Sequence, residues 1–444
     1  MSAIKQLILP SVLGLSLLCG HAQADDFADF AADFQQEFDS FKQQADEEYQ
    51  SYAAQYRQEL LDFKNNVASK WGYAEVSTKH KAVIYSEDLQ EKLVVDFDSQ
   101  QVLVEQAAGS KKSAAQVASW VEKKLLEPIG QAKQQAIQQA KTETSLADAL
   151  AVPVKQVPEL AKQVIASQQP REAEKAIGET LDSLHQEKQQ LREYLKSTEA
   201  ARQQSRDAAE KAKLDEELEL TRKNIQDREQ EQQQYQKVLA KLKTDPAAKQ
   251  VRSHRLNIES KRWQRSSSYR RLVSSAALST ELPEQLIYAI METESSFNPM
   301  AVSPIPAFGL MQIVPNSAGI DVNQHLNKSK KAPSKDQLFT PDLNVTFGST
   351  YLHILYYRYL SSITDPKSRL YCTIAAYNTG AGNVAKTFNG SSMRIKEAAV
   401  KINGMSSEQV YHTLLKRLPY SETRKYLKKV TQAMTYYEQQ VSQI

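Results

Sequence analysis

Residues 283–296 read Pro-Glu-Gln-Leu-Ile-Tyr-Ala-Ile-Met-Glu-Thr-Glu-Ser-Ser. Proline suits the first turn of a helix, and apolar residues recur at helical spacing behind it: Leu286, Ile287, Ile290 and Met291. Glu294 comes four residues after Ile290 and lies on the same apolar face, whereas Glu292 is about 200° away and faces solvent. The spacing therefore predicts a helix over 283–296 that buries one carboxyl group.

A carboxyl group on the apolar face of a helix is costly to bury in its charged form. Burial favours the protonated form, and so does the negative end of the helix dipole nearby. A general acid needs such surroundings to hold its proton near neutral pH. Glu294 is therefore the candidate catalytic residue. The alternative is a structural carboxylate that caps the next turn, around residues 296–298.

Further motifs follow Glu294 along the chain. Gly309-Leu310-Met311-Gln312 comes first, and Ala375-Ala376-Tyr377-Asn378-Thr379-Gly380 comes later. Taken singly, each motif has a simple structural explanation: a tight turn, a core methionine or a helix C-cap. The Gly380-Ala381-Gly382 stretch is not a nucleotide-binding loop, because no strand precedes it.

Taken together and in this order, the motifs resemble the catalytic domain of soluble lytic transglycosylases, which is related to goose-type lysozyme. The resemblance covers about residues 265–440 and rests on five segments: 294–299 (ESSFNP), 301–303 (AVS), 307–312 (AFGLMQ), 376–380 (AYNTG) and 422–426 (ETRKY). Two features depart from the family pattern. Residues 171–243 look like an insertion between two domains, and Pro304-Ile305-Pro306 is unusually stiff.

The resemblance implies a lysozyme-like helical lobe that cleaves the β-1,4 bond between N-acetylmuramic acid and N-acetylglucosamine in peptidoglycan. No water is added, and a 1,6-anhydromuramic acid end is left. Glu294 matches the single acid/base, which protonates the glycosidic oxygen and then takes the proton of the attacking C6 hydroxyl. The other matched positions line the saccharide groove. Tyr377 and Asn378 support the oxocarbenium-like sugar, Tyr426 lies near the acid, and the rest position the saccharide: Ser303, Gly309, Met311 and Gln312.

One carboxylate is enough for this reaction, because the nucleophile is a hydroxyl of the substrate itself. Ordinary glycosidases pair two carboxyl groups ~5–9.5 Å apart. The groove motifs supply no second Asp or Glu. Two alternatives stay open: a hydrolytic muramidase on the same fold, which activates water, and a non-catalytic cell-wall-binding scaffold.

The first 24 residues predict an export signal. Lys5 is followed by an apolar run over 7–18 and by Ala22-Gln23-Ala24, a typical cleavage pattern. The run is too short to span a bilayer, which takes ~20 residues. Cleavage after residue 24 yields a periplasmic protein. The alternative is a lipoprotein signal ending at Cys19 and an attachment to the outer membrane, although Leu18 is bulky for such a signal.

Composition excludes several classes. The chain has 444 residues, of which 41% are hydrophobic and 25% charged, with a net charge of +3, and this is ordinary for a globular protein of several domains. Only Cys19 and Cys372 are present, so neither a disulfide framework nor a Cys/His zinc site is expected. No cofactor, metal or nucleic-acid partner is expected, and the predicted partner is the peptidoglycan glycan strand.

Three segments precede the catalytic region. Residues 25–66 predict an acidic helix with an aromatic stripe. Residues 67–155 predict a small α+β domain, with strands at 81–85, 92–97 and 101–104 and helices at 113–127 and 131–141. Residues 171–245 contain heptad-spaced apolar residues, which indicate a coiled coil formed by a helical hairpin or by one long helix. This segment serves self-association or is a solvated helix without a partner.

The catalytic region is expected over residues 251–444. It carries about 24 Lys and Arg against about 13 Asp and Glu, a net charge near +11, which suits an anionic polymer such as peptidoglycan or the acidic N-terminal helix. After residue 296, helices are expected at 344–361, 368–377, 406–416 and 421–439. The predicted fold class is mainly α: a lysozyme-like helical lobe preceded by a small α+β domain and a long coiled-coil segment.

Overall fold

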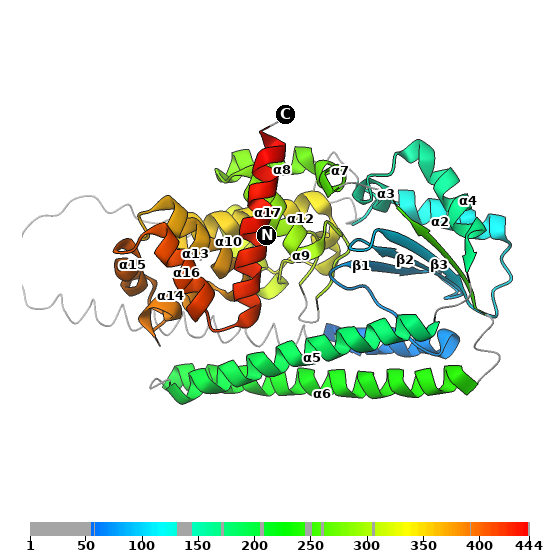
Figure 1. Ribbon diagram of the computed structural model, residues 1–444, viewed down its shortest axis with the longest axis horizontal. Helices are drawn as coiled ribbons and strands as arrows, with labels where there is room; N and C mark the ends of the chain where they lie inside the picture. Colours follow the sequence, from blue (N-terminus) through cyan, green and yellow to red (C-terminus); the bar gives the residue numbers. More distant parts are fainter. Residues whose placement is uncertain are drawn as a thin grey trace, which may run out of the picture. The chain divides into compact units, whose positions relative to one another are not determined.

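The computed structural model describes residues 55–56, 58–130, 144–169, 173–204, 208–244, 251–258, 262–303, 307–390 and 392–442 (Figure 1). The chain divides into two units, Met1–Arg57 and Gln58–Ile444. The predicted signal, most of the acidic aromatic helix and the predicted helix at 131–141 lie outside the described residues. Residues 58–71 are helical.

The C-terminal half is built almost entirely from helices, and the prediction of a mainly α fold is confirmed. Its α-helices are α7 (Arg262–Ser267), α8 (Arg270–Thr280), α9 (Glu284–Ser295), α10 (Ile320–Asn327), α11 (Lys335–Phe339), α12 (Pro341–His353), α13 (Pro366–Thr379), α14 (Ala381–Asn389), α15 (Ile395–Asn403), α16 (Ser407–Arg417) and α17 (Ser421–Val441). Two π-helical stretches, Pro315–Gly319 and Ile354–Tyr359, interrupt the series. The single helix expected over 344–361 is therefore wrong in its second half, where α12 widens into the π-helical stretch.

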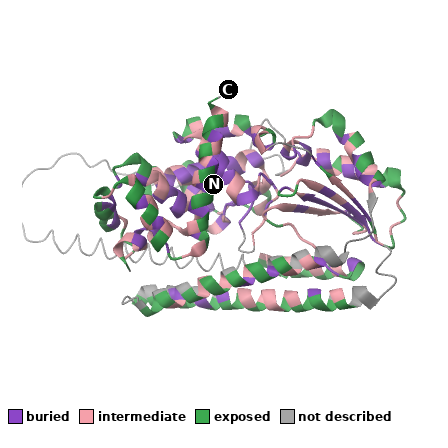
Figure 2. Ribbon diagram, viewed as in Figure 1, coloured by how far each residue is buried: buried purple, intermediate pink, exposed green. Residues whose placement is uncertain are grey.

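Helix α9 forms the centre of this lobe and packs along α17. Its residues Leu286–Met291 are all fully buried, which is why Figure 2 shows this helix largely in purple. A cluster of aromatic rings joins it to the neighbouring helices. Tyr288 stacks on Tyr437 of α17 with ring centroids 5.2 Å apart, and Trp263 of α7 meets Tyr288 edge-on at 5.8 Å. Aromatic pairs of this geometry stabilise a core beyond their buried area.

The α+β part is an antiparallel five-stranded sheet in the order β1-β2-β3-β5-β4. The strands are β1 (Lys81–Tyr85), β2 (Glu91–Asp96), β3 (Gln101–Gln106), β4 (Gln168–Gln169) and β5 (Arg252–Asn257). The first three match the predicted strands closely. Strand β5 belongs to the stretch that the sequence analysis places at the start of the catalytic region, but it pairs with β3 along its whole length.

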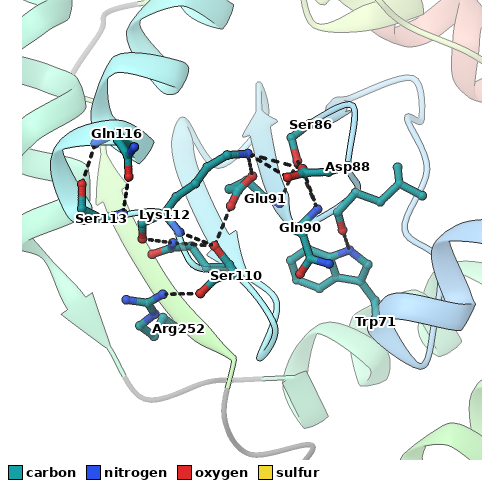
Figure 3. Close-up of polar contacts among 12 residues, drawn as sticks. Trp71, Ser86, Asp88, Gln90, Glu91, Ser110, Lys112, Ser113, Gln116 and Arg252 are labelled. Atoms are coloured by element: carbon teal, nitrogen blue, oxygen red, sulfur yellow. Dashed lines mark hydrogen bonds and ion pairs between the residues drawn. The ribbon is translucent and has the colours of Figure 1, made fainter.

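Helix α4 (Val157–Ala166) packs against β3 and β5, and α2 (Ala114–Leu126) packs on α4. The short helix α3 (Leu146–Ala149) contacts α2, and the 3-10 turn Val154–Gln156 leads into α4. Ser113 begins α2 with a capping box, in which its hydroxyl accepts from the backbone N–H of Gln116. Figure 3 shows the polar network beside this cap. Lys112, which lies between β3 and α2, forms ion pairs with Asp88 and with the fully buried Glu91. These ion pairs tie the start of α2 to the turn between β1 and β2.

Residues 173–244 form a hairpin of two long helices, α5 (Ala173–Gln204) and α6 (Ala208–Thr244), which lie side by side (Figure 1). The hairpin, rather than one continuous helix, is the form that the structure adopts. Ile177 and Leu184 of α5 and Tyr235 of α6 bury their side chains with Tyr73 of the α+β part. The Tyr235 hydroxyl donates to the Ala74 carbonyl. The coiled-coil packing of the pair stays a prediction.

No helix among the described residues is long and apolar enough to cross a membrane.

Candidate active site

Glu294 lies in the last turn of α9, and its side chain is buried among the helices of the lobe. The residue is 5% exposed. The helix ends directly after it, because Ser296 and Phe297 both adopt the left-handed conformation, with φ of 52° and 67°. Two consecutive non-glycine residues at positive φ are strained and need support from their surroundings. The predicted burial of this carboxyl is confirmed.

The electrostatic surroundings of Glu294 favour the protonated carboxyl on balance. Burial raises its pKa, and the nearby carboxyl of Glu422 raises it further. Two groups act in the opposite direction: the Lys79 ammonium, whose Nζ lies 3.4 Å from Glu294 Oε2, and the Tyr426 hydroxyl. The net shift is upward, which is the direction that a general acid requires.

The loop after α9 passes close to this carboxyl, and hydrogen bonds to backbone carbonyl groups hold the loop in place. Gly309 has a φ of 76°, and a Cβ atom at this position would collide with the Asn344 side chain and the Leu338 carbonyl. Its N–H donates to the Ala301 carbonyl at 2.9 Å. The Ser295 hydroxyl donates to the Leu310 carbonyl at 2.8 Å. Gly309 is thus required for the loop to reach the end of α9.

Asn344 of α12 holds the same loop from the other side, and it is fully buried. Its Oδ1 accepts from the Met311 N–H at 2.7 Å, and its Nδ2 donates to the Phe308 and Leu338 carbonyls at 2.8 and 2.7 Å. The sequence analysis missed this residue, since an asparagine at the start of a helix normally signals only a cap.

Gln312 lies at positive φ, 49°, and is 8% exposed. Its Nε2 donates to the carbonyls of Ala301 and Gly309 at 3.1 and 3.0 Å. Its Oε1 is buried and has no hydrogen-bond partner among the described residues. The neighbouring Met311 is fully buried against Gly348, so its side chain packs in the core.

Tyr377 and Asn378 close the site from the end of α13. The Tyr377 hydroxyl donates to the Met311 carbonyl at 2.7 Å, and burial together with the nearby Glu294 raises its pKa well above the ordinary value. Asn378 Oδ1 accepts from the Thr423 hydroxyl of α17 at 2.7 Å. The Tyr377 hydroxyl thus joins the 307–312 and 376–380 motifs, and Tyr377 lies near Glu294.

Tyr426 of α17 is 6% exposed, and its hydroxyl lies near the Glu294 carboxyl, whose pKa it lowers. Burial and the nearby Glu294 raise its pKa well above the ordinary value. This buried hydroxyl therefore faces the carboxyl as a neutral group.

Ser303 is farther along the chain, beside residues 304–306, which are outside the described residues. Its hydroxyl accepts from the Ala307 N–H at 3.1 Å, and its own N–H donates to the Ala307 carbonyl at 3.2 Å. The serine thus shapes the entry to the 307–312 loop. Among the described residues, no three His, Cys, Asp or Glu side chains form a group that could hold a metal ion.

These features define a helical domain with one sheltered carboxyl group at its centre. Residues 271–400 match the family described as "Transglycosylase SLT domain". Over these residues the chain is similar to this family, and the family resemblance predicted from the motifs is confirmed.

Two similar relatives carry the name of one particular enzyme of this class. The chain is 47% identical to membrane-bound lytic murein transglycosylase C of Serratia proteamaculans over 173 residues, which is 39% of this chain and 47% of that protein. The same enzyme of Klebsiella pneumoniae (strain 342) is 45% identical over 173 residues, with the same shares. The matched part thus spans about half the length of these relatives.

Among solved structures, the 70 kDa soluble lytic transglycosylase of Escherichia coli matches 40% of this chain and 26% of its own, with 25% identity and a TM-score of 0.31. We base no conclusion on a likeness at this score.

Proposed function

We propose that the chain is a peptidoglycan lytic transglycosylase that cleaves the β-1,4 bond between N-acetylmuramic acid and N-acetylglucosamine. Its products carry 1,6-anhydromuramic acid ends, and its role is turnover of the cell wall. The observation that carries the proposal is the buried Glu294 carboxyl, whose pKa is raised by burial, at the meeting point of the loop and helix motifs of an SLT domain.

In the first step, the protonated Glu294 gives its proton to the glycosidic oxygen as the bond to the muramic C1 breaks. The positive charge that develops on the sugar ring is then close to the carboxylate that Glu294 has become. In the second step, this carboxylate takes the proton of the C6 hydroxyl while that oxygen bonds to C1. Atoms and protons balance without water, and Glu294 ends the cycle protonated.

The neighbouring groups fit this sequence of steps. Tyr377 is held by the Met311 carbonyl and Asn378 by Thr423, so both stay in place while the sugar changes shape. We assign the free Oε1 of Gln312 to a contact with the saccharide, since buried polar atoms need partners. We assign the Tyr426 hydroxyl to the Glu294 carboxyl, whose pKa it lowers. Ser303, Gly309 and Met311 contribute by shaping the loop.

The scheme assigns no role to a second carboxylate. Glu422 is exposed at the start of α17, and its charge has the smallest effect among the groups that shift the pKa of Glu294. A hydrolytic muramidase would need a carboxylate positioned to activate water. This arrangement favours the lyase over the hydrolase.

Replacement of Glu294 by Gln tests the proposal. We expect the release of soluble wall fragments to fall at least ~100-fold, because general acid catalysis typically contributes ~10²–10⁴. Glu292→Gln is the matched control. Glu292 lies on the same helix two residues away and pairs with Arg262, so this variant should keep most of its activity. Equal rates for Glu294→Gln and the unmodified protein would exclude Glu294 as the acid.

For the cellular location, we propose export to the periplasm directed by residues 1–24, with attachment to the outer membrane if Cys19 is lipidated. The mass of the mature N-terminus decides between a start at Asp25 and an acylated Cys19. Self-association through the helices of 171–243 is a separate proposal, which sedimentation of the purified protein tests.

A further inference from the structure

The stretch Thr78–His80, which leads into β1 of the α+β part, lies directly on the loop that follows α9. The Val302 N–H donates to the Thr78 carbonyl at 3.3 Å. Asn298, which is fully buried, donates through Nδ2 to the carbonyls of Thr78 and Lys79, each at 3.3 Å. These backbone contacts fix the position of the stretch against the catalytic helix.

A second set of contacts holds the same junction at the strained end of α9. The Ser296 hydroxyl donates to Asp98 Oδ1 at 2.5 Å and lies 3.0 Å from His80 Nδ1. Arg265 of α7, which is 8% exposed, donates to the Phe97 carbonyl at 2.6 Å. The turn between β2 and β3 is therefore tied to the helical lobe as firmly as the stretch before β1.

The consequence is that a cation from outside the SLT domain reaches the catalytic carboxyl. Lys79 Nζ lies 3.4 Å from Glu294 Oε2, and the Lys79 side chain is 32% exposed while that of Glu294 is 6% exposed. A cation at this distance from a buried carboxylate favours its charged form.

We propose that Lys79 is a positioning residue of the active site: the α+β part delivers its ammonium to Glu294 and thereby sets the pH range over which Glu294 acts as an acid. The inference deepens the proposed transglycosylase function and rests on it. It also gives the α+β part a role in catalysis, because the contacts at Thr78–His80 and Asp98 hold Lys79 in reach.

Other groups act on the same carboxyl from other elements. Tyr426 and Glu422 approach from α17 and Tyr377 from α13. Among the charged side chains that act on the Glu294 carboxyl, Lys79 has the largest effect. The neighbouring imidazole of His80 is acted on by Asp98, Lys79 and Lys429, and burial lowers its pKa.

The sign of the effect follows from these charges. The Lys79 ammonium lowers the pKa of Glu294, in opposition to burial. Its removal therefore raises that pKa, and the protonated acid persists to higher pH. The alkaline limb of the pH–rate profile, where a general acid loses its proton, should move to higher pH.

Lys79→Met in the full chain tests the inference, with the pH–rate profile for release of wall fragments as the readout. Lys81→Met is a matched control, since Lys81 is also 32% exposed but pairs with Asp96. We expect the alkaline limb to move upward in Lys79→Met and to stay in place in both Lys81→Met and Lys79→Arg. An unchanged limb in Lys79→Met would overturn the proposal.

A second readout keeps this test separate from the proposed function. The titration of the Glu294 carboxyl carbon can be followed by carbon-13 NMR of glutamate-labelled protein and assigned with Glu294→Gln. We expect its midpoint to rise in Lys79→Met and not in Lys81→Met. A protein that released no fragments at any pH would refute the transglycosylase proposal, while this titration would still decide whether Lys79 controls Glu294. An unchanged midpoint contradicts the inference.

Discussion

Glu294 combines two properties that usually exclude each other, since it is buried on an apolar helix face and still has charged and polar neighbours. The apolar pattern of residues 286–291 predicts the burial, because helical periodicity places position 294 on the same face. The neighbours cannot be predicted in the same way. Lys79 is 215 residues away in sequence, and no local pattern links it to Glu294. Gln312 and Tyr377 could be assigned only because their motifs occur in a recognisable order.

Tyr426→Phe probes the hydroxyl that faces Glu294. This hydroxyl lowers the pKa of Glu294, so its removal should raise that pKa and move the alkaline limb of the pH–rate profile upward. Stability should change little, since the substitution keeps the buried aromatic ring and removes only its hydroxyl.

Tyr437→Phe is the control for that change. Tyr437 is also buried in α17, but the carboxyl that acts on its pKa is Glu292. A pH–rate profile that shifts equally in both variants would contradict a specific role for Tyr426.

Gly309→Ala tests the backbone of the 307–312 loop. The position needs a φ of 76° and leaves no room for a Cβ atom, so we expect a loss of about 2–4 kcal/mol in the free energy of unfolding. Gly178→Ala in α5 is the control, because nothing lies within 4 Å of its added Cβ and alanine favours a helix by roughly 0.5–1 kcal/mol. Urea unfolding measures both, and equal stabilities would contradict the strained loop.

The predicted strands and helices agree with the observed ones where the local sequence pattern is strong. Strands β1, β2 and β3 contain alternating or continuous apolar residues and fall where the pattern predicts them. Strand β5 reads Arg-Ser-His-Arg-Leu-Asn, which shows no such pattern, and it is a strand because β3 offers an edge for pairing. No residue pattern in the sequence predicts the π-helical stretch Ile354–Tyr359 after α12.

Asn344→Ala tests how α12 supports the site. The change removes three buried hydrogen bonds to the 307–312 loop and its neighbour Leu338, and it leaves backbone groups without partners. We expect a loss of about 2–4 kcal/mol in the free energy of unfolding and a clear loss of activity. Asn323→Ala, at an exposed amide that donates to Lys331, should cost much less in the same urea titration. A small change in the free energy of unfolding for Asn344→Ala would mean that the 307–312 loop keeps its conformation without the Asn344 hydrogen bonds.

At the scale of the whole chain, the helical hairpin uses part of its apolar surface within the same molecule. Ile177, Leu184 and Tyr235 pack on Tyr73, and Tyr194 stacks on Tyr420 with ring centroids 4.8 Å apart. Heptad spacing predicts the helices and their apolar seam, but it cannot distinguish a partner in the same chain from a second copy.

Tyr235→Ala tests this packing. Loss of a buried aromatic ring typically costs about 3–5 kcal/mol, so the hairpin should separate from the α+β part and become sensitive to protease, while the SLT domain stays folded. Limited proteolysis followed by mass analysis of the fragments measures this, with Tyr235→Phe as the control. An unchanged cleavage pattern would show that the hairpin does not depend on this contact.

The most direct test of the central claim is digestion of purified peptidoglycan by the full chain in water enriched in the heavy oxygen isotope, followed by mass spectrometry of the released saccharides. If Glu294 acts alone on an internal hydroxyl, the new ends are 1,6-anhydromuramic acid and carry no heavy oxygen. Reducing ends that contain heavy oxygen would contradict the account, because they require water as the nucleophile.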